Sequence, residues 1–320
     1  MPTRLIAFGE VLEDQYTDAY GKALHLIGGA PLNFLAMARR ICPDCHLLTC
    51  LGKDQASETA LRMIRRERIE EDMISFDPDS VLGYTSVTVD KSTGERNFTF
   101  HKEHASFLSI RPGDIRKKDF PAGSALYVGT TSLLNADVRK AMEKALSLAS
   151  FVLFDPNRRP TLFARDEQRR LMLSILPKAD ILKIADDEID DFLERKESIS
   201  QTMLSLFPLY PRLKAIFLTK GRKGISLYLR DERRLTAPSI RIENIVDSVG
   251  CGDAAFGAFA GYLISKELLN HRLLLSDDQT LEKGLYLANV CGGLVLSQRG
   301  ALPMPSRGKL HRALMKLKEE

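Results

Sequence analysis

The sequence lacks long apolar runs and a strong charge of either sign. No stretch of its 320 residues approaches the ~20 apolar residues that cross a membrane. The opening residues, MPTRLIAFGE, lack the apolar core of a signal peptide. The net charge is only +4, and no basic stretch carries interleaved aromatic residues. We therefore expect a cytoplasmic protein that binds small molecules, including phosphate-bearing ones, and neither a membrane nor nucleic acid.

Cysteine is also scarce. The five cysteines are an odd number, which argues against a disulfide framework. Cys42, Cys45 and His46 have the spacing of haem-attachment, redox and zinc sites, but no second cysteine pair could complete a zinc site. The pair lies between a helical and a strand pattern, so a plain loop is the favoured interpretation. A redox role for this pair or for Cys251 stays open.

The chain is otherwise ordinary for a globular protein, with 44% hydrophobic and 28% charged residues. Strand-like apolar runs alternate with helix-period segments, which predicts one α/β domain over residues 1–320, with a doubly wound, mainly parallel sheet flanked by helices. Strands are expected at 4–9, 46–52, 125–129, 151–155, 180–184 and 215–219. Helices are expected at 31–41, 58–68, 136–149, 167–176, 186–193, 252–268 and 280–297.

Two segments break this alternation. Residues 84–102 have period-two polarity around a Ser-Thr-Gly turn, which is typical of a hairpin. Residues of about 13–27 are similarly β-like. A small antiparallel β flap on an α/β core predicts a lid that closes over a ligand. The same flap could be an oligomer edge, so a homodimer through the lid is an open alternative.

The strongest chemical signal is DSVGCGDAAFGAF, residues 247–259. Asp253 follows Gly250, Cys251 and Gly252, where a buried helix of small residues is expected to begin. The first amides of a helix have no partner within it and favour negative charge, so this turn can hold an anion. An acid at this place is either a helix N-cap or a chemical group, and the stretch alone does not decide.

The class of phosphate site can be narrowed further. No Gly-X4-Gly-Lys-Ser/Thr occurs, which excludes a P-loop NTPase. Gly250-X-Gly252-X-X-Ala255 fits the dinucleotide fingerprint, but no strand ending in an acid follows at the distance of about 20 residues that a ribose contact requires. A phosphoryl-transfer enzyme needs a carboxylate such as Asp253 as base for the acceptor hydroxyl. A kinase is therefore favoured, with a nicotinamide-dependent oxidoreductase as the alternative.

These motifs resemble those of the ribokinase-like (PfkB) carbohydrate kinases, in particular the fructokinase-like members, and the resemblance covers nearly the whole chain. Residues 247–253 resemble the family's C-terminal signature. This implies that Asp253 is the catalytic base and that the amides of Gly250, Cys251 and Gly252 form an anion hole. GGAPLN (28–33), GEVLED (9–14) and DPNRRPTLF (155–163) resemble the sugar-side segments. The implied substrate contacts are Asp14, Gly28, Gly29, Asn33 and Arg158.

The resemblance extends to the nucleotide and metal sites. TKGRKG (219–224) resembles the family's turn at ATP, and the helix near the C-terminus resembles the adenine-side helix. The implied nucleotide contacts are Thr219, Lys220, Gly221, Gly224 and Asn289. A monovalent-cation site is implied at Asp247, Val249, Val295 and Gly300, and Glu188 is implied to act on Mg²⁺ through water. The implied cofactors are ATP and Mg²⁺, with K⁺ left open.

The chain departs from the family pattern in three places. Ala185 replaces the Asn of the family's Asn-X-X-Glu, and Cys251 replaces the usual Ala of the signature. A thiol at a helix N-terminus can have a lowered pKa, although a small spacer is the simpler interpretation. The lid carries His101 or Lys102 where fructokinase-like members tend to carry Arg.

The reaction implied by the resemblance is ATP-dependent phosphorylation of a primary hydroxyl of a small carbohydrate. Fructose, giving fructose 6-phosphate, is the first expectation. The alternatives are 2-keto-3-deoxygluconate and ribose, and a catalytically inactive sugar-binding regulator is a third class. The residues fix neither the sugar nor the oligomeric state.

Overall fold

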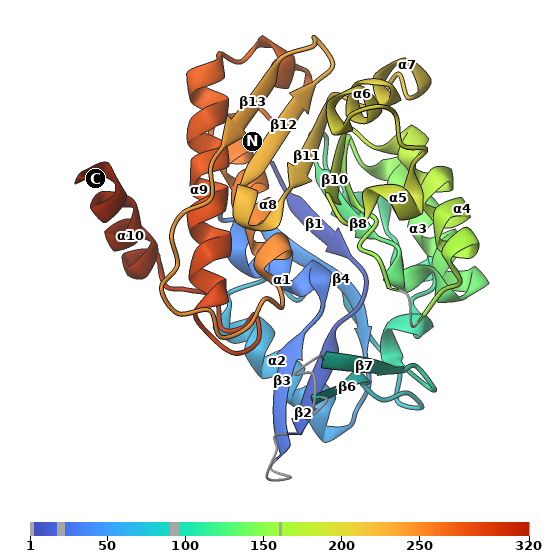
Figure 1. Ribbon diagram of the computed structural model, residues 1–320. Helices are drawn as coiled ribbons and strands as arrows, with labels where there is room; N and C mark the ends of the chain where they lie inside the picture. Colours follow the sequence, from blue (N-terminus) through green and yellow to red (C-terminus); the bar gives the residue numbers. More distant parts are fainter. Residues whose placement is uncertain (1–2, 18–22, 90–95, 160–161, 320) are drawn as a thin grey trace.

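The centre of the molecule is a nine-stranded sheet (Figure 1). The structure, a computed structural model, describes residues 3–17, 23–89, 96–159 and 162–319. Across the sheet the strands are β13 (Arg234–Ala237), β12 (Ile225–Leu229), β11 (Ala215–Thr219), β10 (Ile181–Ala185), β9 (Phe151–Asp155), β8 (Ala125–Gly129), β1 (Leu5–Phe8), β4 (Cys45–Leu51) and β5 (Ile74–Phe76). The strands from β11 to β5 run parallel, and β12 and β13 add an antiparallel edge.

Helices cover both faces of this sheet because its strands are apolar on both faces. In β1, Leu5 and Ala7 contribute to one buried core, while Ile6 and Phe8 contribute to the other. The first core is covered by α1 (Ala30–Ala38), α2 (Gln55–Arg66), α8 (Cys251–Ser265) and α9 (Asp278–Leu296), with α10 (Arg307–Glu319) at the periphery. The second is covered by α3 (Ala136–Leu148), α4 (Arg165–Ile175), α5 (Ile189–Phe192), α6 (Ile199–Leu204) and α7 (Leu206–Leu209). The doubly wound prediction is confirmed.

The lid prediction corresponds to a second, four-stranded sheet. Its order is β3 (Ala23–Gly28), β2 (Leu12–Thr17), β6 (Gly83–Val89) and β7 (Arg96–His101). β2–β3 and β6–β7 are antiparallel hairpins, and β2 and β6 pair in parallel to join them. Two parts of the predicted lid segments, residues 18–22 and 90–95, lie outside the described residues. The sheet follows directly from the carboxyl end of β1, beside the central sheet (Figure 1).

All six expected strands are present, but the expected helix at 186–193 is reduced to the single turn of α5. The reason is a tight turn just before it, in which the Glu188 carboxylate accepts a hydrogen bond from the Ala185 amide at 2.9 Å. Short connections carry 3₁₀ helices at Ser106–Ser109, Pro112–Asp114, Lys117–Asp119, Thr131–Leu134, Leu176–Lys178, Gly221–Lys223 and His271–Leu275. Within the described ranges, no helix has the length and apolar character needed to cross a membrane.

Candidate functional site

Asp253 is the third residue of α8 rather than its N-cap. The N-cap is Gly250, which has φ 76° and ψ 0°. An added Cβ on Gly250 would lie 2.3 Å from the Cβ of Ala301, so both the backbone conformation and the space require glycine. The Cys251 amide closes this turn by donating to the Ser248 carbonyl at 3.3 Å. The structure thereby excludes the capping interpretation of Asp253.

The partner of Asp253 is Asn33 on α1. Asn33 Nδ2 donates to Asp253 Oδ2 at 3.0 Å, and both residues are buried. The helices approach closely because Gly257 faces the backbone of Phe34, where an added Cβ would lie 2.2 Å from the Phe34 oxygen. The other amide oxygen, Asn33 Oδ1, is buried and accepts no hydrogen bond from the described residues. A buried acceptor left in this state usually has a partner outside the protein chain, such as water or a ligand.

Asp14 approaches the same place from lid strand β2. An added Cβ on Gly28 would lie 3.3 Å from Asp14 Oδ2 and 3.9 Å from Asn33 Oδ1, so the two side-chain oxygens converge on this glycine. Burial raises the pKa of Asp14 to about 6, against the opposing charge of Arg159. Gly29 stands at the N-cap of α1 with φ 112°, where an added Cβ would meet the Glu10 oxygen at 2.5 Å. The structure thus brings together the four residues predicted to contact sugar from these two segments.

The lid residues that face Asp14 are not those singled out from the sequence. Asp14 pairs with Thr85, and Thr85 pairs with Phe100. His101 pairs with Tyr84, one position away, and stacks on its ring at a centroid distance of 4.2 Å. Since successive strand residues point to opposite faces, His101 lies on the face opposite to Asp14. Of the two lid residues that stand where fructokinase-like members tend to carry Arg, His101 is therefore turned away from Asp14.

A buried ion pair lies under the first turn of α8. Lys183 Nζ on β10 is 3.1 Å from Asp155 Oδ1 on β9, and the two residues are only 5% and 0% exposed. An added Cβ on Gly252 would lie 3.7 Å from Lys183 Nζ. Burial raises the pKa of Asp155 to about 7 against the charge of Lys183. Burial likewise raises the pKa of Asp253, and the Lys183 charge and the Asn33 hydrogen bond oppose it. Sequence reasoning missed this pair, although a lysine inside the apolar run DILKI was a visible signal.

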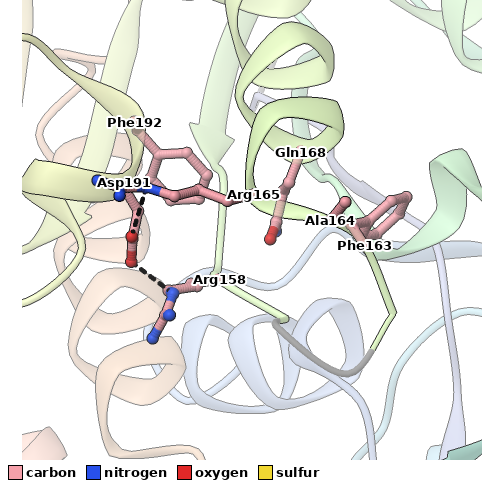
Figure 2. Close-up of a pocket in the computed structure, with 7 residues that line it drawn as sticks. All are labelled: Arg158, Phe163, Ala164, Arg165, Gln168, Asp191 and Phe192. Carbon is pink, nitrogen blue, oxygen red and sulfur yellow. Dashed lines mark ion pairs between the residues drawn. The ribbon is translucent and has the colours of Figure 1, made fainter.

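The arginines after β9 take different places. Arg158, expected to contact substrate, has a 46% exposed side chain whose Nε lies 2.5 Å from Asp191 Oδ2 (Figure 2). Arg165 pairs with the other oxygen of Asp191 at 3.0 Å. Together with Phe163, Ala164, Gln168 and Phe192, these three residues line a cavity of about 160 Å³. The arginine whose charge lowers the pKa values of Asp14 and Asp253 is instead Arg159. The sequence shows two adjacent arginines and does not tell them apart.

Glu188 has the chemistry expected of a partner for a hydrated divalent ion. Its oxygens accept the amides of Arg158 at 2.7 Å and Ala185 at 2.9 Å. Burial opposes its ionisation, but the charge of Lys183 and these two amides hold its pKa below the usual range. An ionised carboxylate retains lone pairs for the waters of Mg²⁺, which keeps much of its hydration in proteins. The residue therefore fits the metal that the sequence implies.

The predicted monovalent-cation residues surround Asp247. This buried carboxylate accepts hydrogen bonds from the amides of Val249 at 3.1 Å and Gly300 at 3.0 Å, and from the hydroxyl of Tyr16 at 3.2 Å. Val295, the fourth residue, precedes Leu296, whose carbonyl accepts the Asp247 amide at 3.3 Å. Buried oxygen atoms suit a hard cation. No group of three or more His, Cys, Asp or Glu in the described part of the chain could hold a metal ion, so a cation here would depend on backbone carbonyls.

The predicted nucleotide turn is a tight structure at the end of β11. The Lys220 amide donates to the Gly224 carbonyl at 2.8 Å, and Gly224 has φ 83°. An added Cβ on Gly224 would lie 2.2 Å from the Ala237 oxygen. Asn289 Nδ2 on α9 donates to the same oxygen at 3.1 Å. The turn with Thr219 and Gly221 is thus joined to α9 through the end of β13. Contact of these residues with a nucleotide stays a prediction.

All five cysteines are free, and four of them are buried while Cys251 is partly exposed. Burial and the charge of Asp253 raise the pKa of Cys251, so the suggested lowering at the helix N-terminus is wrong. The Sγ atoms of Cys42 and Cys45 lie 3.2 Å apart, with Cys42 in the connection between α1 and β4 and Cys45 at the first residue of β4. Both thiols are free and buried, and the loop interpretation holds only for Cys42.

Comparisons with known proteins agree with this geometry. Residues 4–307 match the model of the pfkB family carbohydrate kinases. Probable fructokinase-3 of Arabidopsis thaliana is 28% identical over 311 residues, which cover 93% of this chain and 87% of that protein. Among solved structures, fructokinase with bound ATP from Xylella fastidiosa has a TM-score of 0.85 at 20% identity, covering 99% of this chain and 100% of that chain. Fructokinase from Vibrio cholerae O395 in a form with fructose, ADP and calcium ion has a TM-score of 0.84 at 23% identity, covering 98% and 99%. These structural likenesses concern the fold alone.

Proposed function

The chain belongs to the pfkB family of carbohydrate kinases, and on this premise we propose that it transfers a phosphoryl group from ATP to the primary hydroxyl of fructose, giving fructose 6-phosphate. The curated relatives that match over most of the chain are named fructokinases. The observation that carries the proposal is Asn33, which holds Asp253 with its amide nitrogen and leaves a buried amide oxygen without a partner beside Asp14. Such an acceptor fits a sugar hydroxyl.

Asp253 is proposed to take the proton from the attacking hydroxyl as general base. Its raised pKa favours this role, since a base works best when its pKa lies nearer the operating pH. The amides at the start of α8 face the phosphoryl group that is transferred, and the turn around Gly250 holds them in position before charge develops. Of these amides, that of Cys251 is already engaged with Ser248, so those of Gly250 and Gly252 carry most of this role.

Sugar contacts are proposed for Asp14, Gly28, Gly29 and Asn33. Arg158 reaches the substrate only if it leaves Asp191, so Arg159 is the stronger candidate for a positive charge at the sugar. The lid sheet is proposed to close the site within a single kinase domain. A homodimer through the lid and a cytoplasmic location stay predictions.

ATP is proposed to bind along Thr219, Lys220, Gly221, Gly224 and Asn289. Mg²⁺, when bound, would offset the negative charge of the phosphates, and Glu188 is placed to hold its waters. The loop of Asp247, Val249, Val295 and Gly300 is proposed to hold K⁺ and to fix the start of α8.

The test is ADP release from ATP in the presence of a panel that contains fructose, 2-keto-3-deoxygluconate and ribose. We expect the highest kcat/KM with fructose, and no release above background from Asp253→Asn. Preference for another sugar would overturn the substrate assignment and keep the kinase. Sugar binding without any ADP release would indicate an inactive regulator, and binding of NAD in place of Mg·ATP would indicate an oxidoreductase.

A further inference from the structure

Lys183 is the one feature of the site that neither stability nor the roles assigned so far explain. Its neighbours on β10, Leu182 and Ile184, belong to a hydrophobic core, and Lys183 itself is only 5% exposed. Its charge is paired with Asp155, which is fully buried and whose second oxygen lies 3.5 Å from the hydroxyl of Tyr127. Burying such a pair costs desolvation free energy, and apolar residues of similar volume often stabilise a protein as well or better.

The position of the ammonium group suggests what the pair does. Gly252, the residue before Asp253, has no side chain on the side that faces Lys183, and an added Cβ would lie only 3.7 Å from Nζ. The positive charge therefore lies against the first turn of α8, at the residue before Asp253, and it favours the ionised form of the Asp253 carboxyl.

The groups that act on Asp253 come from several elements. They are Lys183 on β10, Asp155 on β9, Tyr127 on β8, Asp14 on β2, Glu188 before α5, Cys251 on α8, and Arg159 after β9. Of these groups only Lys183 and Arg159 are cations, and Lys183 has the larger effect on Asp253. Most of the remaining groups are acids, whose charges disfavour a second carboxylate nearby.

We propose that Lys183 is a positioning residue for phosphoryl transfer: its ammonium group, held under the first turn of α8 by Asp155, keeps Asp253 ionised and ready to accept the proton of the sugar hydroxyl. The proposal rests on the proposed kinase function. Asp155 lies on the neighbouring strand β9 and pairs with the ammonium group at 3.1 Å.

Two variants break the same ion pair with opposite consequences. Lys183→Met removes the positive charge, so we expect the acid limb of the kcat–pH profile, measured at saturating Mg·ATP and sugar, to move to higher pH by about 1 to 3 units. Activity should recover as the pH is raised. Asp155→Asn keeps a side-chain oxygen that can accept a hydrogen bond from the ammonium group but removes the counter-charge, so the limb should stay in place or move to lower pH. If the ion pair served stability alone, the acid limb of the kcat–pH profile should respond in the same way in both variants.

Titration of the Asp253 carboxyl by NMR separates this proposal from the kinase assignment, because it needs no substrate. The signal is identified by its loss in Asp253→Asn, and its pKa should be higher in Lys183→Met than in the natural protein. An unchanged pKa, or limbs that move in the same direction in both variants, would overturn the proposal. If Lys183→Met does not fold, Asp155→Asn still tests the proposal. A shift of its acid limb to higher pH would then be enough to overturn the proposal. Absence of ADP release from the unaltered protein would refute the kinase and leave the NMR result to decide on Lys183.

Discussion

Gly250→Ala is the substitution that most directly tests the anion hole. An alanine at this position would have to keep φ 76°, which costs about 1–2 kcal/mol for a residue with a Cβ. Its Cβ would also lie 2.3 Å from the Cβ of Ala301, while ordinary contacts begin at 3.4 Å, so one of the two segments must move by about 1 Å. A displacement of about 1 Å in reacting groups can lower the rate on the order of 10²-fold. We therefore expect kcat to fall by roughly two orders of magnitude at saturating Mg·ATP and sugar.

The matched control is Gly123→Ala. Gly123 also has positive φ, 84°, but an added Cβ would meet nothing within 4 Å, and the residue lies in a loop far along the chain from α8. This variant should carry the same backbone cost and lower the Tm by a few degrees without a change in kcat. The reasoning is refuted if Gly250→Ala keeps the kcat of the unaltered protein, or if the control loses activity to the same degree.

Three further predictions concern the groups around this turn. Asp253→Asn is nearly isosteric and keeps the turn, so it should lower kcat by about 10² to 10⁴ while Mg·ATP affinity, measured by calorimetry, stays within a few-fold; near-normal turnover would remove Asp253 from the role of base. Asp14 accepts hydrogen bonds most strongly when ionised, and its pKa is raised to about 6, so sugar affinity should fall as the pH drops below about 6. Asp14→Asn should abolish that pH dependence, and a persisting dependence would assign it to another group. Turnover should be higher in K⁺ than in a large organic cation at equal ionic strength, because a cation near Asp247 would fix the loop into α8; equal rates would show that the protein's own hydrogen bonds suffice.

The architecture could be predicted because its signals are local. Each strand of the parallel core is a short apolar run. The long helices are either amphipathic, such as α2, or continuous buried runs of small and apolar residues, such as α8. The existence and order of these elements therefore followed from the sequence. The failures lie where long-range contacts decide the conformation. The segment before α5 turns tightly because Glu188 bonds to the Ala185 amide, and β12 and β13 form only because β11 offers an edge to pair with.

The site was predictable where motif residues are themselves the functional groups. The glycines and acids at the starts of α1 and α8 lie together as expected, since Asn33 bonds to Asp253. The charges that shift the pKa of Asp253 were harder to predict. Lys183 and Asp155 are distant in sequence and meet only because their strands, β10 and β9, are neighbours. The same limit applies to the two adjacent arginines: Arg158 pairs with Asp191, whereas the charge of Arg159 acts on Asp14 and Asp253.

In the proposed reaction, strand β2 would connect sugar binding to the loop that precedes α8. Asp14 and Tyr16 are two residues apart on one strand, so their side chains point to the same face. Asp14 lies beside Asn33 at the sugar side, while Tyr16 donates to Asp247, whose carboxylate also holds the amides of Val249 and Gly300. A movement of this strand would therefore act on both sides of the proposed site at once. We expect transfer to be favoured when the small sheet covers the sugar, because the acceptor and the turn at the start of α8 would then be held by the same element.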